Sequence, residues 1–210
     1  MELNISGLNR YAFLDPASGR QTIKRTRARS AIVVIGVDSL NRIFVLETWA
    51  ERAATTKIIE QVLVLNNRWQ PKLFGCESNA QQSLFADVLN DTGKRQVIGG
   101  GRKLPLTAVF QPTKVDKDFR IRSAIQPVIA DGRLFVPARL TEMRLEIQAF
   151  PMGGTKDLID ALASAIGLVP FRPVKQMRDD EAKALSAYLR KCGTPAWAIE
   201  QKLREMGAAA

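Results

Sequence analysis

The sequence predicts an α/β fold in which helices flank a mixed-direction β-sheet, followed by a small helical tail. Two observations predict it. Early in the chain, two strand-like runs are joined by a short polar turn, which gives an antiparallel pair. Later strand-like runs are separated by stretches with helical periodicity, which is typical of crossover connections between strands. We therefore expect residues 1–172 to form the α/β domain and residues 173–210 to form the helical tail.

Three strands are expected at the start of the chain. The first is the apolar run YAFL at residues 11–14, which stops at Asp15. Residues 31–37 and 43–49 are rich in β-branched and other apolar side chains, which favour strands. The polar residues 38–41 between them are typical of a hairpin turn, so these two strands should pair antiparallel.

A helix, a strand and a second helix are expected next. Apolar residues recur at helical spacing over residues 54–69, after a polar introduction. Residues 73–76 form a short apolar strand. Asn79 can then cap a helix from residue 80 to about residue 90, with Gly93 beyond its end.

The rest of the domain alternates helices with short connections. A loop with three consecutive glycines precedes a helix over residues 117–130, in which Pro127 predicts a kink or an early end. Residues 133–136 form a short strand, and residues 142–149 form a helix of mixed polarity. After a stretch that contains proline and glycine, residues 157–168 form an apolar helix.

The composition excludes several kinds of site. The chain has no histidine, which rules out Ser-His-Asp and Cys-His catalysis and zinc sites that contain histidine. Its two cysteines are too few for a disulfide framework and favour a reducing compartment. No apolar run approaches the roughly 20 residues of a membrane span, and the first residues do not resemble a signal peptide. We therefore expect carboxylates or lysines to carry any chemistry, and no membrane partner.

The net charge of +10 is concentrated in two stretches. Residues 19–29 hold five basic residues and no acid, and residues 94–122 hold eight basic residues against two acids. The remaining residues are close to neutral. Concentration of this kind favours a polyanionic partner, although one basic run alone is commonly just a solvated face.

Three acids stand where a predicted strand ends or a predicted helix begins: Asp15, Glu77 and Asp157. Such positions converge at one edge of an α/β sheet. Clustered carboxylates repel one another unless a cation neutralises them, and hard oxygen ligands favour Mg²⁺ or Mn²⁺. Taken singly, each acid has an ordinary explanation as a turn residue, the partner of a base or a helix N-terminal residue.

Five segments carry a resemblance to a known family through their order and their spacing. They are YAFLDPASG (11–19), AIVVIGVDSLNRIFVLETW (31–49), RWQPKLFGCESNAQQ (68–82), VDKDFRIRSAIQPVIADGRLFVP (115–137) and FPMGGTKDLIDALASA (150–165). Together they resemble the C-terminal nuclease domain of tailed-phage terminase large subunits, the motors that package DNA into procapsids. The resemblance covers most of the chain, from about residue 11 to about residue 169.

The resemblance implies a ribonuclease H-like fold and cleavage of duplex DNA with two metal ions, Mg²⁺ or Mn²⁺. By the family's pattern, Asp15, Glu77 and Asp157 are the catalytic metal ligands. Asp160 lies three residues after Asp157, on the same side of the helix. It is a candidate auxiliary ligand, but we expect it to have a structural role. The family often has His-Asp-Asp before this helix, so Lys156 stands in place of one acid.

The family also has a basic helix near its active site, which Lys117, Arg120 and Arg122 match, although helical geometry points Arg122 away from the other two. Their implied role is to contact phosphates, which positions DNA without reading its sequence. Further candidates for DNA contacts come from the two basic stretches and are Arg102, Lys103, Lys24, Arg25 and Arg27.

Large terminases also contain an ATPase motor with a phosphate-binding loop, and this sequence has no such motif, so no nucleotide cofactor is expected. The resemblance implies duplex DNA, an ATPase motor, the portal and the small terminase subunit as partners, in the host cytoplasm. Two alternatives remain open. One is another ribonuclease H-like enzyme, such as a Holliday junction resolvase or a transposase core, and the other is a non-catalytic DNA-binding or packaging-interaction domain.

Overall fold

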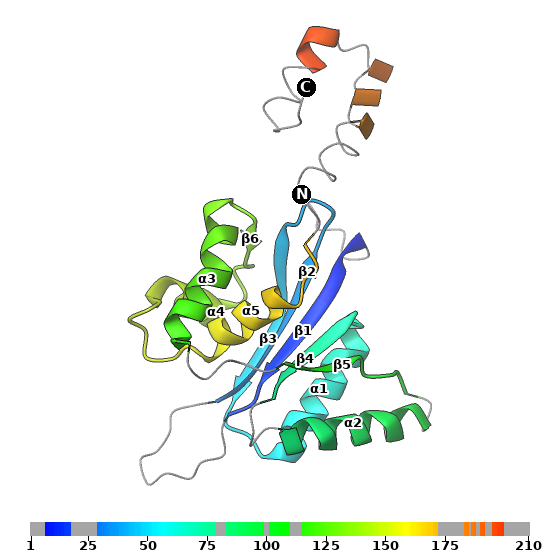
Figure 1. Cartoon of the computed structure of the whole chain (residues 1–210), viewed down its shortest axis with the longest axis vertical. Helices are drawn as coiled ribbons and strands as arrows, with labels where there is room; N and C mark the ends of the chain where they lie inside the picture. The colour runs from blue at the N-terminus through cyan, green and yellow to red at the C-terminus, as the bar shows by residue number, and fades with distance from the viewer. Residues whose placement is uncertain are drawn as a thin grey trace. The chain divides into compact units, whose positions relative to one another are not determined.

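The computed structural model describes residues 7–17, 29–78, 83–98, 101–109 and 115–171, together with short stretches of the tail. Its core is one six-stranded sheet in the order β5-β4-β1-β2-β3-β6 (Figure 1). The strands are β1 (Asn9–Asp15), β2 (Ser30–Val37), β3 (Ile43–Glu51), β4 (Leu73–Glu77), β5 (Leu106–Val109) and β6 (Leu134–Phe135). The helices are α1 (Thr55–Trp69), α2 (Ser83–Ile98), α3 (Lys117–Ala130), α4 (Thr141–Ala149) and α5 (Asp157–Gly167).

The sheet is mixed in direction, as the sequence predicts. β2 pairs antiparallel with both β1 and β3. The turn after Asp38 folds β3 directly back on β2. In contrast, β4 runs parallel to β1, β5 runs parallel to β4, and β6 runs parallel to β3. The helices supply these parallel connections, which need long crossovers. The expected α/β class is therefore confirmed.

Each face of the sheet carries its own apolar core. Side chains alternate between the two faces of a strand, so in β1 Tyr11 and Phe13 join one core while Ala12 and Leu14 join the other. Helices α3, α4 and α5 cover the face that carries Phe13, and α1 and α2 cover the opposite face (Figure 1). Asp15, the last residue of β1, comes two residues after Phe13 and therefore lies on the same face, which α5 covers.

Two details of the segment between β4 and α3 differ from the sequence prediction. Helix α2 does not end before Gly93 but continues to Ile98. Gly93 is buried within the helix, and a Cβ placed there would lie 3.2 Å from the Cβ of Leu104, so this glycine permits close packing instead of ending the helix. The stretch that contains Leu104 then leads into β5, a strand that the sequence does not predict.

Pro127 does not end α3 early, and the helix continues to Ala130. The compact α/β unit extends to Val169. Within the tail, helical residues are described at 183–184, 186–187, 190–191 and 196–199, and the boundary at residue 172 stays a prediction. In the part of the chain that the structure describes, no helix is both long enough and apolar enough to cross a membrane.

Candidate active site

Asp15 and Glu77 end two neighbouring parallel strands on the same face of the sheet. The register pairs Leu14 of β1 with Cys76 of β4, so the two acids that follow lie side by side. Gly75 lies on the face that carries Phe13, and a Cβ there would lie 2.5 Å from the Phe13 ring. Glu77, two residues further on, points to that same face. The strand ends therefore present both carboxyl groups to the helix above, α5.

The carboxyl of Asp15 sits in an environment that opposes its negative charge. Burial raises the pKa of Asp15 well above its usual range, and the negative charges of Asp160 and Glu77 raise it further. The ammonium of Lys117 acts in the opposite direction, and a side-chain hydrogen bond with Glu77 also favours the protonated form. The geometry therefore brings Asp15, Glu77 and Asp160 within electrostatic range of one another, with a shortage of positive charge.

Asp160, in the first turn of α5, is the acid that faces the strand ends. Its side chain is only 3% exposed. The ammonium Nζ of Lys117 lies 2.8 Å from Oδ2 of Asp160, and Nη2 of Arg120 donates to Oδ1 at 2.7 Å and to Oδ2 at 2.9 Å. Burial works to lower the pKa of Lys117, but the charges of Asp160 and Asp15 outweigh it, and the net pKa is raised. Lys117 and Arg120, which are both predicted to contact DNA, thus contact this carboxylate.

Asp157, three residues earlier, is held by a different partner. Its Oδ2 accepts from the backbone N–H of Arg29 at 3.4 Å and from Nε of Arg29 at 3.2 Å. The same guanidinium pairs with Glu142 and, at 3.0 Å, with Glu146. Glu146 in turn accepts from the backbone N–H of Ile159 at 3.0 Å. This network, which we call the Arg29 hub (Arg29, Glu142, Glu146 and Asp157), joins the start of β2 to α4 and to the first turn of α5.

The sequence does not predict the Arg29 hub. Arg29 is one of five bases in its run, and nothing in the run distinguishes it from its neighbours. Glu146 gave a weak signal, because it lies three residues after the buried Met143 and therefore on the inner side of α4. Burial raises the pKa of Glu146, although hydrogen bonds from Ile159 and Thr155 lower it in part.

Of the remaining predicted residues, some lie elsewhere on the unit. Nζ of Lys156 contacts both carboxylate oxygens of Asp118 at 2.7 Å. Arg102 and Lys103 are exposed on the segment before β5, where Nη1 of Arg102 donates to Gln70 at 3.2 Å. The other three predicted contacts lie outside the described residues, and they are Lys24, Arg25 and Arg27.

The strand-end acids and Asp160 have the donor chemistry that Mg²⁺ and Mn²⁺ prefer, namely hard carboxylate oxygens. Across the described ranges, no three acids or thiols converge closely enough to hold an ion as they stand. Both oxygens of Asp160 instead contact the bases Lys117 and Arg120. These clustered carboxylates need positive charge nearby, and Lys117 supplies part of it. A divalent cation would supply the rest, so the donor set fits such an ion.

Cys76 lies next to Glu77 but has no reactive character. The residue is fully buried in the core between the sheet and α1. Burial, followed by the negative charges of Asp15 and Glu77, raises the pKa of its thiol to about 12. A thiol that remains protonated is a poor nucleophile, so Cys76 serves as a core residue.

Comparison with known proteins gives a likeness in fold. No protein-family model and no curated protein matches the sequence. The large terminase nuclease of the thermophilic phage G20c, solved with bound zinc, superposes with a TM-score of 0.55 at 17% identity, covering 78% of this chain and 82% of that one. The yeast mitochondrial Holliday junction resolvase superposes with a TM-score of 0.45 at 10% identity, and the match covers 75% of this chain and 77% of that one. RuvC of Thermus thermophilus in complex with a Holliday junction superposes with a TM-score of 0.40 at 12% identity, and the match covers 83% of this chain and 96% of that one. The chain therefore has the ribonuclease H-like fold that its resemblance to terminase nucleases implies.

Proposed function

We propose that this chain is a metal-dependent endonuclease that cuts duplex DNA during phage genome packaging, as the nuclease part of a large terminase. The observation that supports it is the meeting of Asp15, Glu77 and Asp160 at one edge of the sheet, where their charges oppose one another. Buried carboxylates of like charge are costly unless a cation is bound. A cluster of this kind is what phosphodiester cleavage with divalent ions requires.

Within this proposal, Asp15 and Glu77 hold the metal from the strand ends. Asp160 is the third ligand that the electrostatics favour, because its negative charge acts on Asp15 more strongly than that of any other acid. A bound Mg²⁺ or Mn²⁺ would supply a Lewis acid that activates water and stabilises the leaving oxygen. Asp157 then acts through the Arg29 hub by fixing the first turn of α5, and with it the position of Asp160.

DNA is the proposed substrate because basic residues border the acidic cluster. The side chain of Lys117 is 47% exposed, so its ammonium can reach a phosphate once it leaves Asp160. Arg120 supports Asp160 and adds positive charge close to the cluster. Contacts further along the duplex are proposed for Arg102, Lys103, Lys24, Arg25 and Arg27. An ATPase motor, the portal and the small terminase subunit remain proposed partners, in the host cytoplasm.

Cleavage of supercoiled plasmid tests the proposal. With Mn²⁺ or Mg²⁺ the protein should nick and then linearise the plasmid, and EDTA should stop the reaction. Asp15→Ala should abolish cleavage, while Glu51→Ala, which removes an exposed acid at the end of β3, should leave it unchanged. Cleavage that persists in Asp15→Ala, or a folded wild-type protein that does not cut, would reject the proposal. Preferential cutting of a four-way junction would indicate a resolvase instead.

A further inference from the structure

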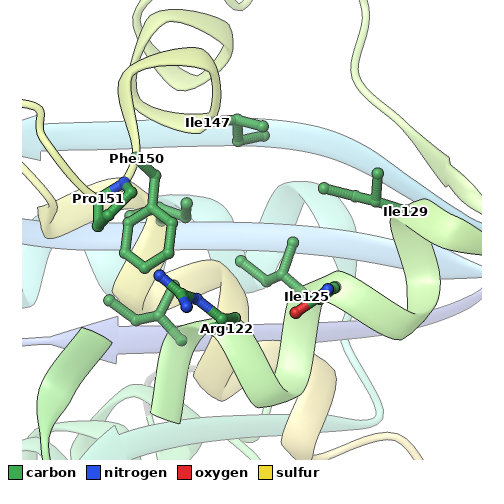
Figure 2. Close-up of a pocket in the computed structure, with 9 residues that line it drawn as sticks. Arg122, Ile125, Ile129, Ile147, Phe150 and Pro151 are labelled. Atoms are coloured by element: carbon green, nitrogen blue, oxygen red, sulfur yellow. The ribbon is translucent and has the colours of Figure 1, made fainter. Parts of the chain in front are cut away.

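An apolar groove lies between α3 and α4, away from the carboxylate cluster. Both helices pack on α5, and a cavity of about 290 Å³ opens between them. Isoleucines from all three helices line it, and Figure 2 shows Ile147, Phe150 and Pro151 facing Ile125 and Ile129 across the space. The side chain of Ile129 is large and apolar, yet the residue is 48% exposed. The groove is therefore a hollow with an apolar lining, and one of its large side chains is left partly uncovered.

The cavity continues into a second hollow of about 240 Å³. The two hollows share Ile129 and Ile147, and the second extends to Leu134 and Val136. On α3 the lining runs from Ile121 to Ile129, which at 1.5 Å per residue spans about 12 Å, or two helical turns. Two adjoining hollows suit two apolar side chains four residues apart on a bound helix, which lie about 6 Å from each other.

The charged residues of the groove are all basic. Arg122 and Arg144 line the two hollows, Gln126 and Gln148 are their other polar residues, and within the described part of the chain no acid lines either one. Among the described residues, no ion pair includes Arg122 or Arg144. The apolar floor does not suit a polyphosphate backbone, and two copies of a basic groove would repel each other. Charge complementarity therefore favours an acidic partner with an apolar stripe.

We propose that this groove, lined by Arg122, Ile125, Ile129, Arg144 and Ile147, binds an acidic amphipathic helix of a protein partner. Two apolar side chains of that helix fill the hollows, and its flanking carboxylates pair with the two arginines. The surface is separate from the proposed nuclease site. Arg122 follows Arg120 by two residues, which is about 200° around the helix axis, so the groove and the basic residues that hold Asp160 occupy different sides of α3.

The test is selection from a displayed library of 16-residue helical peptides. Two positions four residues apart vary over apolar side chains, and the flanking positions vary over glutamate, lysine and glutamine. On the natural chain we expect glutamate-flanked clones to be enriched at least tenfold over lysine-flanked clones. In spectra with labelled isoleucine methyl groups, the enriched peptide should shift Ile125, Ile129 and Ile147.

Matched charge reversals separate the groove from general electrostatics. Arg122→Glu/Arg144→Glu should lose the enriched peptides, whereas Lys57→Glu/Arg68→Glu, an equal charge change on α1 over the other face of the sheet, should keep them. Unchanged amide spectra would show that both variants fold. Enrichment of lysine-flanked clones, or enrichment that survives the groove reversal, would overturn the inference.

The inference would also be overturned if no peptide were enriched on the natural chain. That result would mean that the groove has no occupant, or that this chain's own tail or a second copy fills it. Asp15→Ala should bind the selected peptide as the natural chain does. The inference can therefore stand or fall independently of the nuclease proposal.

Discussion

Replacing Arg29 with methionine is expected to destabilise the α/β unit by about 3–5 kcal/mol. The Arg29 side chain is 17% exposed and serves three carboxylates, of which Glu146 is 3% exposed and Glu142 is largely solvated. Removing one partner of a buried ion pair costs about 3–5 kcal/mol, because the remaining charge stays buried without compensation. The pair with Glu142 adds about 0–1 kcal/mol at most. For a unit of this size, the melting temperature should fall by about 6–20 °C.

Urea unfolding followed by circular dichroism measures this cost. Arg68→Met is the matched control, because its pair with Glu47 lies at the surface with the arginine side chain 56% exposed, and it should cost less than about 1 kcal/mol. Adding Glu146→Gln to Arg29→Met should recover part of the loss, since it removes the buried charge that Arg29 leaves behind. An Arg29→Met protein no less stable than Arg68→Met, or no recovery in the double variant, would refute the reasoning.

Three further outcomes follow from the contacts around the carboxylates. Lys117→Met should tighten Mn²⁺ binding by about tenfold in calorimetry, because the ammonium no longer competes for Asp160. The control Lys94→Met should leave Mn²⁺ affinity unchanged. Weaker binding in Lys117→Met would contradict this reasoning. Asp160→Asn should weaken Mn²⁺ binding by about tenfold or more and Asp157→Asn by less, and the reverse order would restore Asp157 as the ligand. The raised pKa of Asp15 means that the metal-free fold loses stability as the pH rises from the ordinary pKa of an aspartate, about 4, through the raised one. Asp15→Asn should therefore gain stability over wild type as the pH rises above about 4, and a difference in urea unfolding that does not change with pH would argue against it.

The positions of Asp15 and Glu77 could be predicted because they depend on local pattern. Each follows a short apolar strand, and side-chain alternation then sets the face on which the carboxyl lies. The choice between Asp157 and Asp160 could not be predicted in the same way. Both stand in the first turn of α5, three residues apart, so helical spacing places them on nearly the same side.

Long-range partners decide which of these two acids faces the strand ends. Asp160 meets Lys117 and Arg120 from α3, while Asp157 meets Arg29 across 128 positions of sequence. Neither pairing leaves a trace in local composition, and the sequence-based choice of Asp157 over Asp160 rested on the family's pattern. Packing likewise accounts for Gly93, which serves the close approach of Leu104 and does not end α2.

A crystal of the protein soaked in Mn²⁺ tests the central claim most directly, through the anomalous signal of the ion. The claim is that Asp15, Glu77 and Asp160 form a metal-dependent catalytic centre. It predicts Mn²⁺ at about 2–2.5 Å from carboxylate oxygens of Asp15 and Glu77, with Asp160 turned toward the ion and Lys117 released from it. An ion bound only at Asp157, or no ion at the strand ends at saturating Mn²⁺, would contradict the claim.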